Sequence, residues 1–230
     1  MPADSRRPLA VPDQLKAGDR VREVLLQAAG EVFAEKGYDR ATSKEICERA
    51  GVNSAAVNYH FGGIDALYMA ALRRAHQRLT TIEALWEIAS STASPQDKLR
   101  AYIAPIVRWL ASPASATWEM RVLGREIVSP SPLREAFVET EILPKIRLMR
   151  GIIGELMGVP PDDAIVGRAM LTAVAPCILM AVANRSMLET ILPSLADPET
   201  EIPRLVEHYE RFIRAGLEAV AEQSRAESRG

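Results

Sequence analysis

The sequence contains little cysteine and few aromatic residues. Cys47 and Cys177 stand alone in 230 residues, without the spacing of a metal site. Such cysteines indicate reduced, buried, small apolar side chains, with a redox pair as the alternative. Aromatic residues make up 5% of the chain, whereas Ala, Leu, Glu and Arg are abundant. This composition favours helix over sheet.

The chain also lacks an excess of charge of one sign. Its formal net charge is -2, and residues 1–88 hold twelve Lys and Arg against twelve Asp and Glu. Composition therefore does not indicate a strongly basic nucleic-acid-binding protein. If the protein binds DNA, a local surface must carry the interaction.

No segment is typical of export or of membrane insertion. The N-terminus has arginines but no apolar core of a signal peptide. The longest apolar run, Ala169–Ala183, is too short to span a bilayer and contains Pro176. We therefore expect a soluble, cytoplasmic protein with no membrane partner.

Motifs for catalysis and for cofactors are missing as well. The sequence has no P-loop, no dinucleotide-binding glycine fingerprint and no nucleophile elbow. His60, His76 and His208 are too scattered for a metal site, and Glu119 and Glu126 form no plausible catalytic set with them. We expect no enzyme, no cofactor and no metal.

Helical periodicity and helix-end signals run through most of the chain. The prediction is an all-α fold of about nine or ten helices. The predicted helices span residues 19–36, 42–50, 54–61, 64–89, 95–111, 115–128, 132–157, 162–185, 186–195 and 202–223. Pro105, Pro144 and Pro176 fall inside three of them, where we expect kinks or breaks. The helix 64–89 should bury a face made of Leu67, Ala71, Ala75, Leu79, Ile82 and Trp86.

Segment 42–61 has the order helix, tight turn, helix. Thr42 and Glu45 have capping-box spacing, Gly51 suits the left-handed end of a helix, and Asn53 or Ser54 caps the next one. The second helix is too short to be stable alone and must dock through Val57 and Phe61. Its outer face then holds small or hydrogen-bonding side chains rather than the Lys and Glu of a solvated face: Ser54, Ala55, Ala56, Asn58, Tyr59 and His60.

This arrangement is a helix-turn-helix, in which the second helix enters the major groove of DNA. The stretch from Arg20 to Leu72 resembles the DNA-binding module of the TetR (tetracycline-repressor) family. The matching segments are AGEVFAEKGY (29–38), TSKEICERAGV (42–52), AVNYHF (56–61) and DALY (65–68). The alternative interpretation of such a motif is a plain scaffold, with His60 as a packed histidine.

The resemblance implies a role for each matched residue. Ser43 and Lys44 would contact phosphates, Tyr59 and His60 would clamp the DNA backbone, and the bases would face Ser54, Ala55, Ala56 and Asn58. One position departs from the family pattern, because Ile64 stands where members often carry Lys. A phosphate contact is then lost or taken over by backbone N–H groups, and DNA affinity and its salt dependence are expected to be lower.

In the TetR family the remaining chain is a helical domain for ligand binding and dimerisation. Trp118, Arg121 and Arg125 share one helical face and could line a ligand cavity. The full predicted set is Trp118, Met120, Arg121, Arg125, Phe137 and Cys177. The alternative is that both arginines are surface residues whose stems cover Trp118 or that pair with Glu119 and Glu126.

Segment 162–185 is apolar around most of its circumference and must be buried on several sides. The resemblance implies that it and segment 202–223 form a four-helix dimer interface. The predicted contacts are Met170, Val174, Leu205, Tyr209, Phe212 and Leu217. An ordinary central core helix is the alternative.

These observations predict a mobile arm (1–18), a three-helix helix-turn-helix DNA-binding domain (19–66), a helical ligand-binding and dimerisation domain (67–223) and a tail (224–230). Arg6 and Arg7 of the arm could enter a minor groove. The predicted function is a ligand-responsive repressor that binds double-stranded DNA at a palindromic operator as a homodimer and is released by a small-molecule effector. The alternative is a helical small-molecule-binding protein without specific DNA binding.

Overall fold

The computed structural model describes residues 17–183 and 185–227, and within them every regular element is helical. This confirms the predicted all-α fold. The chain divides into an N-terminal unit, residues 1–72, and a C-terminal unit, residues 73–230. The boundary follows Leu72, six residues beyond the sequence-based boundary after residue 66. Arg6 and Arg7 lie outside the described residues. Ala17 and Gly18, the last two residues of the predicted arm, belong to the first turn of α1.

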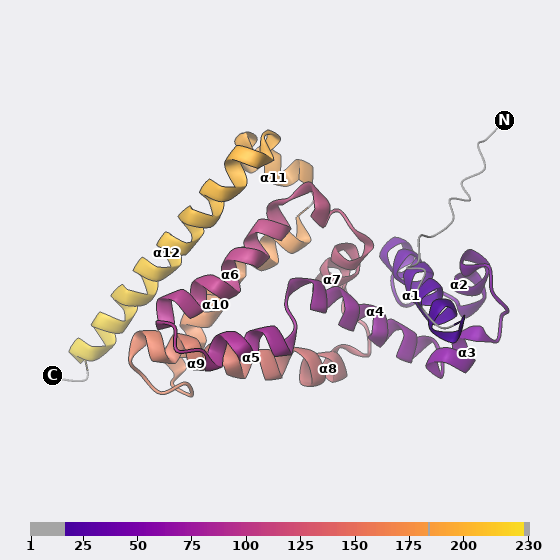
Figure 1. The fold of residues 1–230 in the computed structure, drawn as a ribbon, viewed down its shortest axis with the longest axis horizontal. Coiled ribbons are helices and arrows are strands. Elements are labelled where there is room, and N and C mark those ends of the chain that lie inside the picture. Colours follow the sequence, from indigo (N-terminus) through magenta and orange to yellow (C-terminus); the bar gives the residue numbers. More distant parts are fainter. Residues whose placement is uncertain (1–16, 184, 228–230) are drawn as a thin grey trace. The chain divides into compact units, whose positions relative to one another are not determined.

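The N-terminal unit consists of three helices and the first part of a fourth (Figure 1). They are α1 (Ala17–Lys36), α2 (Ser43–Ala50), α3 (Ala56–Phe61) and α4 (Ile64–Leu79), which continues into the C-terminal unit. Each helix contributes a fully buried apolar face, with Phe33 of α1 meeting Tyr68 of α4 edge-on at 4.7 Å between ring centroids. The main core residues are Leu25, Val32, Phe33, Ile46, Val57, Leu67 and Tyr68.

Local signals set the ends of the short helices. Thr42 caps α2, because its hydroxyl accepts a hydrogen bond from Glu45 N at 3.2 Å. The Glu45 carboxylate turns to Lys36, at 2.7 Å, instead of closing the reciprocal half of the capping box. Gly51 ends α2 with φ of 67°, a conformation that costs other residues a steric penalty. Asn53 takes the predicted cap role, as its side chain accepts from Ala55 N at 2.8 Å, and α3 begins at Ala56.

The C-terminal unit packs its helices around one extended apolar core. After α4 come α5 (Ile82–Ser90), α6 (Pro95–Ala111), η1 (Pro113–Ser115), α7 (Trp118–Val128), α8 (Arg134–Phe137), the π-helical turn η2 (Val138–Ile142), α9 (Leu143–Met157), α10 (Ala164–Val182), α11 (Arg185–Ile191), η3 (Pro193–Ala196) and α12 (Pro198–Glu227). The core draws mainly on α6, α9, α10 and α12, with Val107, Ile153, Val166 and Ile213 among its members.

The prediction of one helix over residues 64–89 is wrong. The chain breaks at Thr80 and Thr81, and the Thr81 hydroxyl caps α5 by accepting from Ala84 N at 3.1 Å. This break resets the helical phase, so Leu85 is fully buried while Trp86, a predicted core residue, is 61% exposed. Threonine favours such breaks because its hydroxyl can replace a helical hydrogen bond at an N-cap.

The prolines act differently at different sites. Pro105 and Pro176 lie inside α6 and α10, and Pro144 follows the π-helical turn at the start of α9. The last helix runs through Pro203 and extends to Glu227, so it begins earlier and ends later than predicted. Of the predicted tail, residues 224–227 belong to α12 and residues 228–230 lie outside the described residues.

Candidate nucleic-acid interface and ligand-binding regions

The second helix of the helix-turn-helix, α3, has one buried side and one open side. Val57 is fully buried and holds the helix on the core of the N-terminal unit. Ser54, Ala55 and Asn58 are exposed, and Ala56 and His60 are half-buried. Tyr59 is 84% exposed, an unusual state for a large aromatic side chain. The residues expected to read DNA therefore lie together on the open side of α3 and the turn before it.

The residues expected to touch phosphates are accessible at the start of α2. Ser43 is half-buried, and the Lys44 side chain is 82% exposed with Glu48 3.9 Å away. Residues 52–64 contain no Lys, Arg, Asp or Glu, so the reading surface is electrically neutral apart from His60. Arg22 of α1 adds a cation beside this surface, because its guanidinium lies 4.7 Å from the Phe61 ring centroid. Sequence reasoning missed Arg22, since periodicity does not reveal which α1 residue faces α3.

Two ion pairs fasten α2 to α1. Arg49 binds both carboxylate oxygens of Glu35, at 2.7 and 2.8 Å, and Lys36 binds Glu45. The Glu35 carboxylate raises the already high pKa of Arg49 further. A bidentate Arg–carboxylate pair constrains orientation as well as distance. These contacts neutralise acidic groups of α1 and α2 and define how the two helices meet.

A hydrogen bond also ties the loop before α2 to the start of α4. The Tyr38 hydroxyl donates to Asp65 Oδ1 at 2.7 Å, and the Tyr38 and Tyr68 rings lie 5.0 Å apart. Because the hydrogen bond to Asp65 needs the protonated phenol, it raises the pKa of Tyr38. The segment that presents α2 and α3 is thus anchored on both sides.

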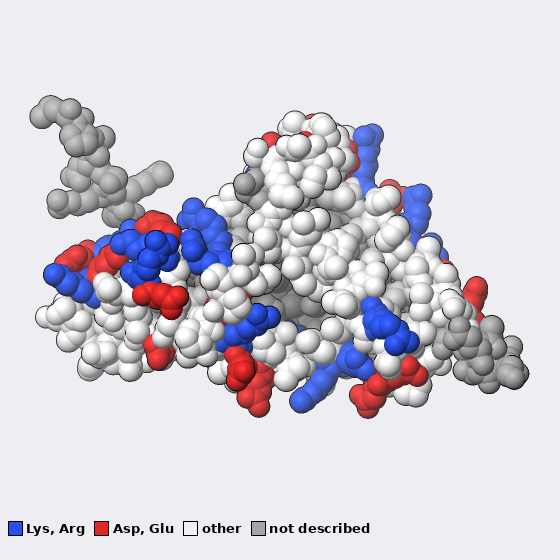
Figure 2. All heavy atoms as spheres, turned by 180° about the vertical axis from the view of Figure 1, so that it is seen from behind, with Lys and Arg blue, Asp and Glu red and all other residues white. Residues whose placement is uncertain are grey.

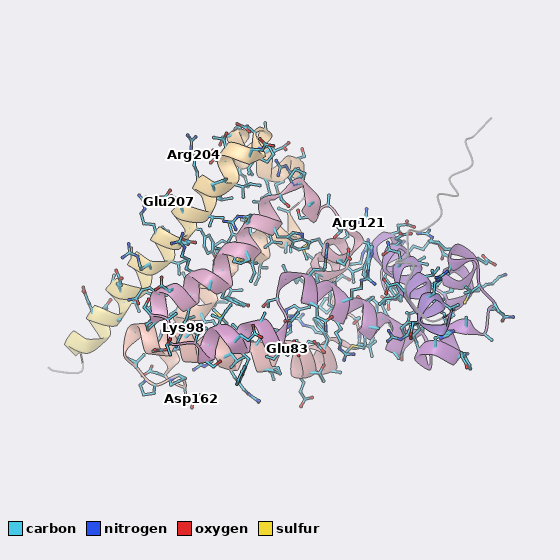
Figure 3. The ribbon with its side chains drawn as sticks, in the orientation of Figure 1. Glu83, Lys98, Arg121, Asp162, Arg204 and Glu207 are labelled. Atoms are coloured by element: carbon cyan, nitrogen blue, oxygen red, sulfur yellow. The ribbon has the colours of Figure 1, made fainter. Side chains whose placement is uncertain are left out.

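The predicted ligand-binding residues of the C-terminal unit differ in exposure and in their neighbours. On α7, Trp118 and Met120 are buried, Arg125 is half-buried and Arg121 points outward (Figure 3). The Phe137 ring is buried against His76, with 5.8 Å between centroids. Neither of the two cavities described below includes any of the six predicted residues in its lining. Arg74 lies 5.8 Å from the Trp118 ring centroid.

Cys177 and Tyr209 form a polar contact inside the C-terminal unit. Their sulfur and hydroxyl oxygen are 3.5 Å apart, and the Tyr209 hydroxyl also donates to the Ala173 carbonyl. Burial raises the pKa of the Cys177 thiol, which therefore stays protonated near neutral pH. Tyr209 and Leu217 are buried within their own chain, and their place at a dimer interface stays a prediction.

The other predicted dimer contacts are partly or largely exposed. Phe212 is 65% exposed, whereas Met170, Val174 and Leu205 are half-buried. Large exposed apolar side chains on α10, α11 and α12 accompany Phe212: Leu171, Ile178, Leu179, Val182, Met187, Ile191 and Val220. Figure 2 shows a wide area of the C-terminal unit without Lys, Arg, Asp or Glu. Monomeric soluble proteins rarely expose so many apolar side chains on neighbouring elements.

Within the described residues, α10 is the one helix long and apolar enough to cross a membrane, judged by length and composition. Only 17% of its apolar stretch is buried in the unit. Its inner residues Val166, Ala169 and Ala173 pack into the core. This helix therefore combines a core-facing side with a bare apolar side.

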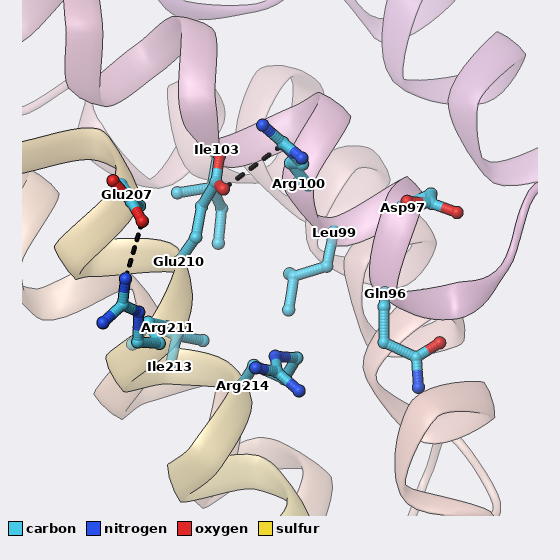
Figure 4. A pocket seen from close by; sticks show the side chains of 10 residues that line it. All are labelled: Gln96, Asp97, Leu99, Arg100, Ile103, Glu207, Glu210, Arg211, Ile213 and Arg214. Carbon is cyan, nitrogen blue, oxygen red and sulfur yellow. Dashed lines mark hydrogen bonds and ion pairs between the residues drawn. The ribbon is translucent and has the colours of Figure 1, made fainter. Parts of the chain in front are cut away.

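One cavity, of about 270 Å³, lies between α6 and α12 (Figure 4). Its floor is apolar and its rim carries charges that largely pair with one another. Arg100 lies 3.2 Å from Glu210, and Arg211 lies 2.6 Å from Glu207. The remaining oxygen of Glu210 is buried without a hydrogen-bond partner among the described residues.

A second cavity, of about 290 Å³, lies where α4, α5, η2 and α9 meet. It is lined by Gln77, Ile82, Glu83, Thr140, Glu141, Pro144 and Lys145. Lys145 is 5% exposed, and its amine lies 2.7 Å from His76 Nδ1 and donates to the Thr80 carbonyl at 3.0 Å. Burial lowers the pKa of Lys145, and burial together with the Lys145 charge lowers the pKa of His76 to about 4. Sequence reasoning missed this cluster, because its members are about 70 residues apart.

The second half of α4 is held by polar and aromatic contacts within the C-terminal unit. Arg73 lies 2.5 Å from Glu141, and Arg74 lies 3.9 Å from Glu119. Arg78 lies 6.0 Å from the Trp109 ring centroid. The same helix supplies the buried Leu67 to the N-terminal unit. One continuous helix therefore belongs to both units.

A helical fold with an open, neutral second helix in a helix-turn-helix defines a class, the helix-turn-helix DNA-binding proteins. Comparison with known families makes the assignment specific. Residues 25–71 match the model of the bacterial regulatory proteins of the tetR family. Residues 95–217, more than half of the chain, match the C-terminal domain of the HTH-type transcriptional dual regulator CecR. The chain belongs to the TetR family of transcriptional regulators.

Curated relatives are similar over different lengths. The HTH-type transcriptional activator FasR of Mycolicibacterium smegmatis is 35% identical over 85 residues, which cover 37% of this chain and 38% of FasR. The chain thus matches well under half of the first curated relatives. The HTH-type transcriptional repressor NicS of Pseudomonas putida is 26% identical over 190 residues, covering 80% of this chain and 86% of NicS.

Solved structures share the fold at low sequence identity. The transcriptional regulator FadR of Bacillus subtilis, in complex with stearoyl-CoA, has a TM-score of 0.62 at 16% identity, over 85% of this chain and 98% of FadR. A TetR-like regulator from Rhodococcus sp. RHA1 has a TM-score of 0.57 at 19% identity, over 93% of this chain and 99% of that chain. At these identities the likenesses show the fold alone.

Proposed function

We propose that the protein is a dimeric, ligand-responsive transcriptional repressor that acts on DNA in the cytoplasm, and that it is not an enzyme. The observation that carries the proposal is the open side of α3, where Asn58 and Tyr59 are exposed on a short helix anchored by the buried Val57. A face of small and hydrogen-bonding side chains can approach base edges closely. Several relatives are named repressors, NicS among them.

In this proposal the contacts divide by type. Asn58 would hydrogen-bond a base edge, and Ala55 and Ala56 would touch thymine methyl groups. Ser43, Lys44, Tyr59 and His60 would hold the DNA backbone, which sets register but not sequence. Arg22 extends the set as a further cation for phosphate. Because few cations surround this surface and Ile64 supplies none, we expect a shallow dependence of affinity on salt.

A second copy of the chain would cover the exposed apolar residues of α10, α11 and α12. A symmetric pair would present two α3 helices to two half-sites about 34–36 Å apart, which matches a palindromic operator. Phe212 and Leu171 offer large apolar surface to such a contact, with Met170, Val174 and Leu205 at its edge.

The effector would bind in the C-terminal unit and favour a state of lower DNA affinity. By linkage, DNA binding would then weaken effector binding by the same factor. The long α4, clamped by Arg73, Arg74 and Arg78, would carry the change between the units. The fold likeness to FadR of Bacillus subtilis in complex with stearoyl-CoA supports an amphiphilic effector with an anionic group, which Arg121 or Arg125 would meet.

The test is binding to the intergenic DNA beside the protein's own gene, compared with scrambled DNA of equal length at two salt concentrations. We expect a strong preference for the intergenic DNA, lost or much reduced in Asn58→Ala. A good bidentate base contact contributes about 1–3 kcal/mol of discrimination. Gln96→Ala, which removes an exposed amide far along the chain, should bind like the wild type. Equal, weak and salt-sensitive binding to the intergenic and the scrambled DNA would mean that this DNA holds no operator. If selection from random sequences then also yielded no preferred DNA, the repressor proposal would be refuted and the small-molecule-binding alternative favoured.

A further inference from the structure

The cavity at the start of α5 and α9 is lined by a buried cation, Lys145, that has no close ion pair among the described residues; Glu141 and Glu83 act on its charge only from a longer distance. Lys145 is 5% exposed, yet among the described residues no carboxylate lies within 4.0 Å of its amine. Its two hydrogen-bond partners, His76 and the Thr80 carbonyl, are both neutral groups at neutral pH. An ammonium group has three donors, so one donor remains beside the cavity. A buried charge of this kind is costly unless something pairs with it.

The opposite charge at the cavity belongs to Glu83, which acts on Lys145 through space without a close ion pair. Glu83 lies on the exposed side of α5 (Figure 3) and forms no hydrogen bond or ion pair within the described residues. Glu141, by contrast, is neutralised by Arg73 at 2.5 Å. The lining therefore offers one positive group and one negative group, with Gln77 and Thr140 as further hydrogen-bonding side chains and Ile82 and Pro144 as apolar wall.

The backbone around the cavity is irregular on two sides. The α4–α5 break frees the Thr80 carbonyl for Lys145, and the π-helical turn η2 presents Thr140 and Glu141. Single π-helical turns within helices frequently occur at functional sites.

We propose that this cavity binds a small zwitterion, with the carboxylate of the ligand on Lys145 and its ammonium group on Glu83. A volume of about 290 Å³ suits a compact polar molecule of the amino-acid class rather than a long acyl chain. The site is separate from the predicted α7 residues, none of which lines it. Binding of the zwitterion does not depend on the proposed function. An effect of that binding on DNA affinity rests on the proposed function, and it would act through Gln77, which belongs to the last turns of α4.

The binding experiment uses the full chain and three probes with similar short alkyl chains that differ in the charged groups they carry: γ-aminobutyrate with both, butyrate with the carboxylate only and butylamine with the ammonium only. We expect saturable binding of γ-aminobutyrate in a ligand-observed NMR titration, with butyrate and butylamine at least about tenfold weaker, because each loses one charge-assisted contact. Lys145→Met should weaken γ-aminobutyrate binding by about 10- to 100-fold, and Glu83→Gln by about tenfold.

Two controls keep the experiment decisive. Glu87→Gln removes an exposed carboxylate from the same helix outside the cavity and should bind like the wild type. Glu83→Gln alters an exposed side chain and is expected to fold normally, so the test does not depend on the folding of Lys145→Met. Absence of saturable binding, or equal binding by the wild type and Glu83→Gln, would overturn the proposal and leave Lys145 a structural residue only.

A further measurement separates this site from the repressor function. If γ-aminobutyrate binds and changes the affinity of the protein for its DNA, the site is regulatory. If it binds the wild type but the protein binds no DNA specifically, the zwitterion site stands and the proposed function fails. If specific DNA binding is present but γ-aminobutyrate does not bind, the site fails and the proposed function stands.

Discussion

The guanidinium group of Arg185 donates a hydrogen bond to the backbone carbonyl of Ala111, 74 residues earlier in the chain. The same group also donates to the Leu195 carbonyl and pairs with Glu189 at 2.6 Å. One side chain on α11 thereby joins the end of α6 to η3. Carbonyl groups at helix ends have no partner in their own helix, and Arg185 supplies one.

Arg185→Lys should destabilise the C-terminal unit, because a single ammonium group cannot reach three acceptors in the geometry of the guanidinium fork. We expect a loss of about 1–2 kcal/mol, since two carbonyls lose a charged donor in a partly exposed place. Urea unfolding followed by tryptophan fluorescence reports on this unit alone, as Trp86, Trp109 and Trp118 all belong to it. Arg204→Lys, on the exposed side of α12, serves as the matched control. Equal unfolding midpoints for the two variants would contradict the role of Arg185.

Gly51→Ala should destabilise the helix-turn-helix, because Gly51 has φ of 67° and other residues lose about 1–2 kcal/mol in this conformation. Hydrogen exchange of the α2 and α3 amides should become faster, and DNA binding should fall with it. Gly216→Ala lies in α12 with open space around the added Cβ and should be neutral or slightly stabilising. Unchanged exchange in α2 and α3 would count against the strained turn.

His76 should make the C-terminal unit sensitive to mild acid. Burial, then the Lys145 charge, lowers its pKa from 6.5 to about 4. The unfolded chain then binds the proton more readily than the folded chain, so stability is fully present above about pH 6.5 and falls as the pH drops toward 4. Urea midpoints measured across this range should fall less steeply in His76→Gln than in the wild type. His208→Gln, which alters an exposed histidine, should keep the wild-type profile. Parallel profiles for all three proteins would show that His76 does not cause the loss of stability in acid.

If the proposed dimer forms, a charge introduced into its interface should separate the subunits. Phe212→Glu places a carboxylate where a 65% exposed phenyl ring now lies, and burying that charge against a second copy is unfavourable. Sedimentation velocity should show a dimer for the wild type and a monomer, or at least a much weaker dimer, for Phe212→Glu. Trp86→Glu changes a similarly exposed aromatic residue on α5 and should remain dimeric. A monomeric wild type at micromolar concentration would refute the dimer.

Much of the fold follows from local signals in the sequence. The bounds of α6, Pro95–Ala111, are those predicted, because a capping serine and a proline mark its start and Pro113 follows its end. The helix-turn-helix was equally predictable from the sequence. Thr42, Gly51 and Asn53 define its helix ends through hydrogen bonds and dihedral angles that involve only residues nearby in the chain. Val57 is buried and Asn58 is exposed, because adjacent residues of a helix are turned by about 100° from one another.

Tertiary structure decided what depends on distant residues. Periodicity assigns faces only along an unbroken helix, so the break at Thr80 and Thr81 moved Trp86 to the surface and Leu85 to the core. The sequence indicated that α10 is apolar all round, but only packing decided that its inner side meets the core and its outer side stays bare. It likewise could not pair His76 with Lys145, which lie 69 positions apart. The sequence by itself therefore determined the all-α fold and the helix-turn-helix motif, because both follow from local signals. The cavities and the buried charges arose from chain segments that only folding brings together.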